Sequence, residues 1–120
     1  MSLKLLIADD EYFIRQRIKK IIPWEKLNLT FAGEAENGQQ VIDHLEKEPV
    51  DLLLLDIKMP QMNGIETARY IKEHFPSVHM LILSGYNDFE YARTVIRYGV
   101  KEYLLKPVAA EELERALSEC

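Results

Sequence analysis

Acidic, hydroxyl and amine side chains stand where four apolar runs of the sequence end, and together they could bind a metal ion and a phosphoryl group. Asp9 and Asp10 follow the first run, Asp56 ends the third, Ser84 follows the fourth and Lys106 follows the fifth. Taken alone, each has an ordinary explanation, because Asp and Ser form turns and cap helices and Lys is usually a surface residue. Their occurrence as a set indicates a site rather than a series of turns.

The charges of this set determine the chemistry that it could perform. Carboxylates held at close range repel one another, and a divalent cation relieves that repulsion. Oxygen ligands without paired His or Cys favour Mg²⁺, or Mn²⁺, over zinc, and Mg²⁺ keeps coordination positions for a phosphoryl oxygen. The Lys106 ammonium and the Ser84 hydroxyl could hold further oxygens while one carboxylate acts as the nucleophile. The set therefore predicts metal-dependent transfer of a phosphoryl group to an aspartate.

An alternation of apolar runs and helix-period segments supplies the elements that must position these residues. Leu52, Leu53, Leu54 and Leu55 are consecutive, and such uninterrupted apolar sequence is typical of a strand buried on both faces of a parallel sheet. The pattern predicts strands at residues 3–8, 30–34, 50–55, 78–83 and 102–105, and helices at 11–22, 38–47, 64–75, 88–98 and 109–118. Five such units predict a doubly wound three-layer α/β sandwich, with ligands beyond the carboxyl ends of the strands.

Length and composition limit the possible functions. The chain has 120 residues, 48% of them hydrophobic, which suits one compact domain over residues 1–120. A net charge of -5 argues against nucleic-acid binding by this domain. The sequence has no apolar run near the roughly 20 residues that span a bilayer, no visible signal peptide, and one cysteine, which cannot form an internal disulfide. We expect a cytoplasmic domain without membrane contacts.

Four basic residues, Arg15, Arg17, Lys19 and Lys20, stand close together in the first predicted helix. Charge clusters of this kind usually form the solvated face of a helix. The same cluster could be a docking surface for an acidic partner. The sequence alone leaves both interpretations open.

Several ordered segments of the chain resemble the receiver domain of bacterial two-component response regulators. The segments that carry the resemblance are Asp9-Asp10, Asp56-Ile57-Lys58-Met59-Pro60-Gln61-Met62-Asn63-Gly64, Ser84-Gly85 and Tyr103-Leu104-Leu105-Lys106-Pro107. They occur in the order that the family shows, and they span nearly the whole chain. The resemblance implies a flavodoxin-like parallel sheet of strand order 2-1-3-4-5 with helices on both faces.

The resemblance also implies a role for each matching residue around the metal ion. Asp56 matches the phosphoacceptor, which is also a ligand of Mg²⁺. Asp10 matches a direct Mg²⁺ ligand, and Asp9 matches the carboxylate that acts through a bound water. The backbone carbonyl of Lys58 matches a further metal ligand. Asn63 departs from the family pattern, since many receivers have Asp there, but this position is not a metal ligand.

A second group of matching residues concerns the phosphoryl group and the response to it. Lys106 matches the lysine that contacts the phosphoryl group, Ser84 the switch hydroxyl and Tyr103 the aromatic switch residue. Gly85 is small enough to leave room for a phosphodonor. Pro107 matches a position that the family places after a cis peptide bond.

The resemblance implies a signalling switch rather than an enzyme, with at most slow self-dephosphorylation. A sensor histidine kinase would phosphorylate Asp56, and the surface of the fourth helix, fifth strand and fifth helix would change to regulate an output domain. Residues 84–92, with Ile22-Pro23-Trp24, resemble receivers linked to AraC-type helix-turn-helix domains. The implied partners are therefore the kinase, a DNA-binding output domain and, after phosphorylation, a second copy of the domain.

Other functions fit parts of the sequence. A Mg²⁺-dependent phosphatase or phosphotransferase would also use an aspartate nucleophile, but such enzymes usually carry a second carboxylate two residues later, where this chain has Lys58. A receiver-like binding module that is not phosphorylated would not need the complete set of polar residues. A nucleotide-binding flavodoxin-like protein would need a Gly-rich loop after the first strand, which the sequence lacks.

Overall fold

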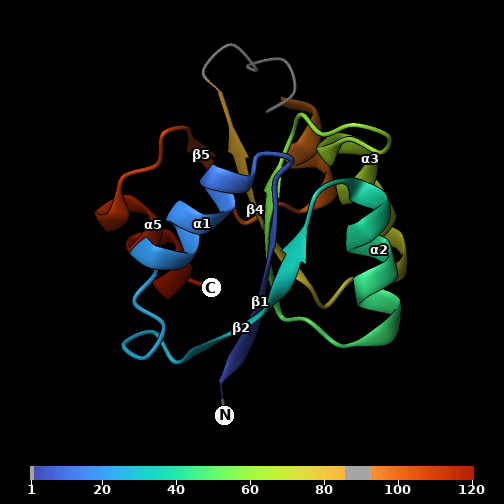
Figure 1. Cartoon of the computed structure of the whole chain (residues 1–120). Coiled ribbons are helices and arrows are strands. Elements are labelled where there is room, and N and C mark those ends of the chain that lie inside the picture. Colours follow the sequence, from blue (N-terminus) through green and yellow to red (C-terminus); the bar gives the residue numbers. More distant parts are fainter. Residues whose placement is uncertain (1, 86–92) are drawn as a thin grey trace.

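The computed structural model describes residues 2–85 and 93–120. In this part of the chain, five parallel strands form one sheet in the order β2-β1-β3-β4-β5 (Figure 1). The strands are β1 (Leu3–Ala8), β2 (Leu29–Ala35), β3 (Leu52–Asp56), β4 (His79–Ser84) and β5 (Glu102–Leu105). The predicted fold class and strand order are confirmed.

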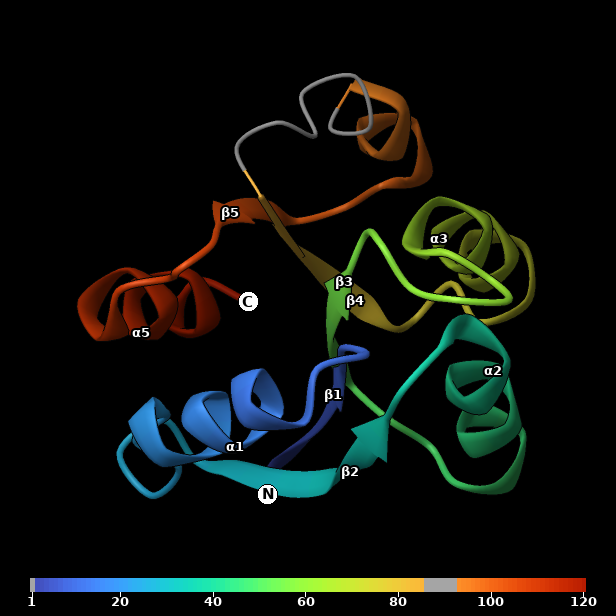
Figure 2. The same ribbon diagram turned by 45° about the horizontal axis from the view of Figure 1, so that its top comes forward.

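Helices cover both faces of the sheet (Figure 2). They are α1 (Tyr12–Ile21), α2 (Gly38–Lys47), α3 (Gly64–His74), α5 (Ala110–Ser118) and the short 3₁₀ helix η1 (Ile96–Tyr98). One face packs against α1 and α5, and the other packs against α2 and α3. The result is the three-layer sandwich of the flavodoxin-like folds. Helices in the described residues lack the length and apolar character needed to cross a bilayer.

The central strand β3 explains why the core has two halves. All of its residues are buried. Because side chains alternate between the faces of a strand, Leu53 and Leu55 join the core beneath α2 and α3, whereas Leu52 and Leu54 join the core beneath α1 and α5. The uninterrupted run of leucines in the sequence therefore reflects burial on both faces.

The strands end level with one another at the edge where the sequence concentrates its polar residues. Asp56 at the end of β3 pairs with Leu83, and Ser84 at the end of β4 pairs with Leu105. The residues that follow β1 and β5 leave the sheet at the same edge. This register brings widely separated segments of the chain together at the carboxyl ends of the strands.

Helix α3 begins directly against the end of β3. Its N-terminus has a capping box, in which the Asn63 side chain accepts from the Glu66 amide at 2.9 Å and the Glu66 carboxylate accepts from the Asn63 amide at 3.2 Å. The next residue, Gly64, donates its amide to the carbonyl of Ile57 at 2.8 Å. A Cβ on Gly64 would lie 2.4 Å from the backbone oxygen of Asp56, so glycine permits this close approach.

Several predicted boundaries differ from the observed ones by one or two residues. Strand β3 begins at Leu52 rather than at residue 50, because the Asp51 carboxylate accepts from the Lys4 amide at 2.8 Å and so replaces a backbone acceptor of the ladder. Of the helix predicted at 88–98, residues 88–92 lie outside the described residues. Its last turn is the 3₁₀ helix η1, and Gly99, at φ 74°, ends it in the left-handed conformation.

Candidate functional site

Three carboxylates converge at the carboxyl edge of the sheet. Asp9, Asp10 and Asp56 each place one carboxylate oxygen within 4.8 Å of the others. Asp9 and Asp56 are 0% and 4% exposed, whereas Asp10 is exposed. Like charges at such short range destabilise one another, most strongly where water is excluded. The cluster therefore requires a compensating positive charge.

Lys106 supplies a positive charge from the segment that follows β5. Its Nζ lies 2.7 Å from Oδ2 of Asp9 and 3.1 Å from Oδ1 of Asp56. Burial by itself would lower the pKa of Lys106, but the contacts with Asp9 and Asp56 outweigh burial and raise that pKa. The ammonium therefore stays protonated and bridges the two buried carboxylates.

Asp56 has the most unusual ionisation in the cluster. Burial, followed by repulsion from Asp9, raises the pKa of Asp56 from 3.8 to about 7, and attraction to Lys106 offsets only part of that increase. A carboxyl group that is held near neutrality by burial and neighbouring charge is typical of functional sites. Additional positive charge beside Asp56 would favour its ionised, nucleophilic form.

The carboxylates fit a divalent cation in their charge and in the chemistry of their oxygens. Oδ1 of Asp9 accepts a hydrogen bond from the Glu11 amide at 2.9 Å. Its Oδ2 is buried beside Lys106, yet it accepts no hydrogen bond of good geometry from the described residues. The Lys106 ammonium offsets only one of the three carboxylate charges, so a metal ion would offset the repulsion that remains. Because the clustered donors are all oxygens, Mg²⁺ or Mn²⁺ fits them better than zinc.

A cavity of about 450 Å³ opens beside the exposed carboxylate. A liquid water molecule occupies about 30 Å³, so this volume can hold a hydrated cation together with a phosphoryl group. Its lining residues come from the two segments that follow β1 and β3: Asp10, Ile57, Lys58, Met59, Pro60 and Asn63. The predicted metal-binding residues Asp10 and Lys58 therefore border one solvent-accessible space.

Ser84 and Tyr103 form a hydroxyl pair on the neighbouring strands β4 and β5. Ser84 is buried, and its Oγ donates to the Gly85 carbonyl at 2.9 Å and shares a short hydrogen bond with the phenolic oxygen of Tyr103. Any movement of the Ser84 hydroxyl toward the carboxylates must therefore change its contact with Tyr103.

The main chain around Lys106 is tied to its neighbours on both sides. The Lys106 amide donates to the carbonyl of Ser84 at 2.8 Å. Farther along, Nη2 of Arg17 on α1 donates to the carbonyl of Val108 at 2.8 Å. The peptide bond between Lys106 and Pro107 is cis, as the resemblance implies. These contacts fix the segment from which the Lys106 ammonium reaches the carboxylates.

The family of the chain follows from a comparison of its sequence with family models. The model described as the response regulator receiver domain matches residues 5–118. The chain belongs to the response regulator receiver domain family. The matched region contains all the carboxylates of the cluster, Lys106 and the hydroxyl pair of Ser84 and Tyr103.

Relatives of this receiver domain are regulators of transcription. The domain is 38% identical over 116 residues to the uncharacterized transcriptional regulatory protein YesN of Bacillus subtilis. The matched region covers 97% of this chain and 32% of YesN. It is 37% identical over 111 residues to the transcriptional regulatory protein HptR of Staphylococcus aureus, and this match covers 92% of this chain and 43% of HptR. The chain thus spans less than half the length of these curated relatives.

Solved structures of similar receivers have the same fold. The REC domain of the response regulator AraT from Geobacillus stearothermophilus has a TM-score of 0.94 and 38% identity, covering 99% of this chain and 92% of that one. A two-component transcriptional regulator AraC from Clostridium phytofermentans has a TM-score of 0.90 and 34% identity, with coverage of 98% and 92%. The likeness to receivers of AraC-type regulators is therefore confirmed.

The burial of Arg15 and its ion pair with Glu34 were not predicted from the sequence. The interpretation of the basic cluster as a solvated helix face is wrong for Arg15, which is 5% exposed and places Nε 2.7 Å from Oε1 of Glu34. A signal was available, because Arg15 precedes the buried Ile18 and Ile22 by three and seven residues and so shares their helix face.

Proposed function

We propose that this receiver domain is a phosphorylation switch in which Asp56 accepts a phosphoryl group from phosphohistidine of a sensor histidine kinase. An Asp56 carboxylate oxygen attacks phosphorus, a P–O bond forms, and the P–N bond breaks with its electron pair on the histidine nitrogen. The observation that carries this proposal is the convergence of three carboxylates and one ammonium at the sheet edge, where Asp10 also lines a cavity.

The residues of this chain have distinct tasks in that transfer. Lys106 already contacts Oδ1 of Asp56, so its ammonium can follow the new phosphoryl oxygens and neutralise part of their charge. We assign Asp10, Asp56 and the backbone carbonyl of Lys58 to binding Mg²⁺, or Mn²⁺, and Asp9 to binding it through water. When bound, the metal ion offsets the negative charge of the carboxylates and of the phosphoryl oxygens.

Phosphorylation of Asp56 changes the positions of the Ser84 and Tyr103 side chains relative to the unphosphorylated state. A phosphoryl group adds about two negative charges and strong acceptor oxygens, which attract the Ser84 hydroxyl. Because Ser84 shares a hydrogen bond with Tyr103, its displacement releases the phenol ring into a new position. The altered surface includes η1, β5 and α5, where Ile96 and Leu105 are exposed apolar side chains. Phosphorylation thus shifts a balance between two surface states.

We assign the altered surface to contacts with a DNA-binding output domain in the longer protein and to a phosphorylation-dependent homodimer. Both named relatives are transcriptional regulators that are more than twice as long as this domain. In this role the domain, residues 1–120, is a cytoplasmic regulatory unit that turns over no small substrate. Its own net charge of -5 leaves DNA binding to the output domain.

Intact-mass spectrometry tests the assignment of the phosphoacceptor. After incubation with acetyl phosphate and Mg²⁺, the wild-type domain should gain the mass of one phosphoryl group, and the Asp56→Asn variant should gain none. Asp51→Asn is the matched control, because Asp51 immediately precedes the same strand at its opposite end. Equal labelling of the Asp56→Asn variant, or sustained hydrolysis of simple phosphomonoesters by the wild type, would contradict the proposal.

A further inference from the structure

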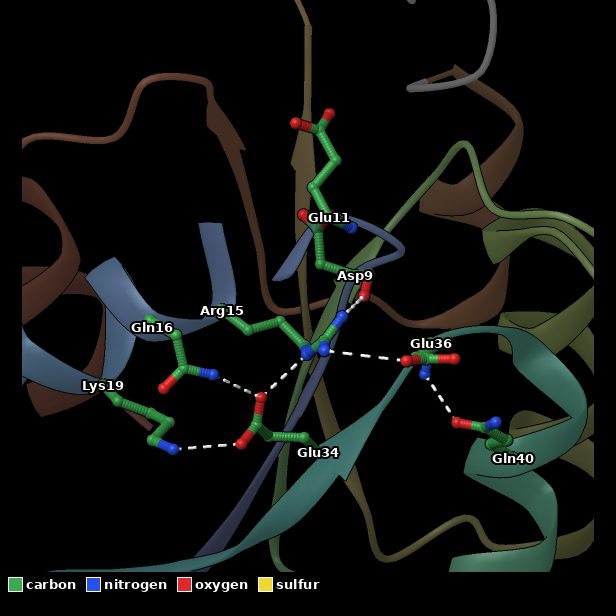
Figure 3. A network of polar contacts seen from close by, with 8 residues as sticks. All are labelled: Asp9, Glu11, Arg15, Gln16, Lys19, Glu34, Glu36 and Gln40. Carbon is green, nitrogen blue, oxygen red and sulfur yellow. Dashed lines mark hydrogen bonds and ion pairs between the residues drawn. The ribbon is translucent and has the colours of Figure 1, made fainter. Parts of the chain in front are cut away.

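Arg15 is a buried cation that reaches from α1 to the turn carrying the acidic pair. Its side chain is 7% exposed, and its Cζ lies 5.7 Å from the centroid of the Tyr12 ring. Nη1 donates to the backbone carbonyl of Asp9 at 2.7 Å, while Nε donates to the Glu34 carboxylate at 2.7 Å (Figure 3). The guanidinium thus joins the end of β1 to the edge strand β2.

The peptide between Asp9 and Asp10 is held through its carbonyl by this contact. The Asp9 amide donates to the Ala35 carbonyl at 3.0 Å, which fixes the other side of the residue. The Asp9 carboxylate accepts from the Glu11 amide at 2.9 Å. Without the Arg15 donor, the carbonyl of Asp9 loses the bond that opposes rotation of its peptide plane. Such a rotation would change the direction of the Asp10 side chain.

The position of Arg15 is itself fixed by a network on β2. Oε1 of Glu34 accepts from Arg15 and, at 3.0 Å, from Gln16, while Oε2 accepts from Lys19 at 3.0 Å (Figure 3). A carboxylate oxygen of Glu36 lies 3.8 Å from Nη2 of Arg15. Arg15 bonds Glu34 and Asp9 at once through two separate nitrogens, Nε and Nη1, of one rigid planar guanidinium. A lysine carries all its donors on one nitrogen and so cannot place them at both of these positions.

We propose that Arg15 is a positioning residue that holds the Asp9–Asp10 peptide so that the Asp9 and Asp10 carboxylates converge with that of Asp56, and that it thereby sets the affinity for Mg²⁺. The proposal rests on the metal-dependent function assigned above. Groups that orient metal ligands from outside commonly change metal affinity 10- to 100-fold when they are removed. Arg15 acts on the main chain of the ligand turn rather than on the cation.

Lys19 offers a matched comparison that separates positioning from general stabilisation. Both residues are basic, both lie on α1 and both donate to Glu34, but Lys19 bonds the oxygen of Glu34 that Arg15 leaves free. The Asp9 carbonyl accepts from Arg15. Arg15→Met and Lys19→Met therefore each remove one cation from Glu34, and only the former removes the donor at Asp9.

Isothermal titration of the folded domains with MgCl₂ tests the proposal. We expect Arg15→Met to raise the Mg²⁺ dissociation constant about tenfold or more, and Lys19→Met to leave it within about twofold of wild type. Arg15→Lys should also bind more weakly than wild type, because charge alone does not restore both contacts. In ¹⁵N-edited NMR spectra, the Glu11 amide, which donates to Asp9, should shift in Arg15→Met without metal and stay in place in Lys19→Met.

A double variant keeps the test decisive if Arg15→Met fails to fold. Arg15→Met with Glu34→Met replaces the ion pair by apolar side chains, which often preserves folding. It should still show the weakened Mg²⁺ binding. An Mg²⁺ dissociation constant within twofold of wild type in a folded Arg15 variant, or an equal loss in Lys19→Met, would overturn the proposal. Wild-type protein that binds Mg²⁺ but gains no phosphoryl mass would instead overturn the proposed function alone.

Discussion

The ammonium of Lys106 lies between the two buried carboxylates, 2.7 Å from Oδ2 of Asp9 and 3.1 Å from Oδ1 of Asp56. This arrangement offsets part of the repulsion between the two carboxylates without a metal ion, because it places one internal cation between them. A divalent cation bound by the cluster would compete with Lys106 for the same carboxylate oxygens.

Replacing Lys106 with Met should strengthen Mg²⁺ binding while slowing phosphoryl transfer. The variant loses the internal cation, so the carboxylates attract the metal more strongly, and we expect the dissociation constant to fall about tenfold, or about 1.4 kcal/mol. Calorimetric titration measures the affinity, and mass spectrometry with acetyl phosphate measures the transfer. Lys101→Met, at the opposite end of β5, should change neither quantity. An unchanged affinity in Lys106→Met would show that the two cations do not compete.

Mg²⁺ should stabilise the folded domain through the carboxylate cluster. A ligand that binds the folded state and is present at 100 times its dissociation constant adds about 2.7 kcal/mol to the free energy of unfolding. We expect urea unfolding in MgCl₂ to occur at higher denaturant than in EDTA. Asp10→Asn should remove most of this difference, because it replaces one carboxylate of the cluster with a neutral amide. Asp43→Asn on α2 should retain the difference. Equal metal stabilisation of Asp10→Asn would place the binding site elsewhere.

The raised pKa of Asp56 predicts how stability depends on pH without metal. Between pH 4 and pH 7 the folded domain keeps a proton on Asp56 that the unfolded chain loses, since burial and Asp9 raise the pKa from 3.8 to about 7. This contribution to stability is present at low pH and is lost as the pH rises to 7. In EDTA, the stability of Asp56→Asn relative to wild type should therefore increase by about 2 to 3 kcal/mol from pH 5 to pH 8. A pH-independent difference would contradict the raised pKa.

Gly64→Ala should destabilise the domain and displace Asp56, because the new side chain would clash with the backbone at the end of β3. The new Cβ would lie 2.4 Å from the backbone oxygen of Asp56 and 2.6 Å from Cα of Ile57, and neither backbone atom can move without shifting the end of β3. We expect a loss of about 3 kcal/mol in the free energy of unfolding and slower phosphoryl transfer.

Gly99→Ala is the comparison for this substitution. Its Cβ would meet no atom within 4 Å, but its φ of 74° disfavours alanine, so the expected loss is about 1 kcal/mol with normal transfer. Chemical denaturation and mass spectrometry of both variants measure the two effects. The prediction is wrong if Gly64→Ala is as stable and as readily phosphorylated as Gly99→Ala.

Much of the fold and the membership of the site could be predicted because both depend on local patterns. The leucines of β3 indicate burial on both faces, and the polar residues that end each apolar run must meet at one edge of a parallel sheet. The sequence could not reveal that Lys106 bridges Asp9 and Asp56, because distances between strand ends depend on register. The Asp51 side chain moved the start of β3 for a similar reason, since its partner is on another strand.

The contacts of Arg15 could not be predicted from the sequence. Its spacing to Ile18 predicts that Arg15 lies on the buried face of α1. A buried charge is stable only when it is paired, so the prediction also requires an acidic partner. That partner, Glu34, lies 19 positions away on β2. Helix periodicity indicates which residues face inward, and it says nothing of which strand a long side chain will reach.

The site draws its residues from β1 to the segment beyond β5, and this has a consequence during synthesis. A ribosome makes all three carboxylates, the last at position 56, long before it reaches the lysine at position 106 that offsets them. Until Lys106 leaves the exit tunnel, a partly formed sheet would bring the three carboxylates together without the ammonium that offsets their charge. Folding of the acidic edge should therefore wait for the final quarter of the domain, or depend on cellular Mg²⁺ in the interval.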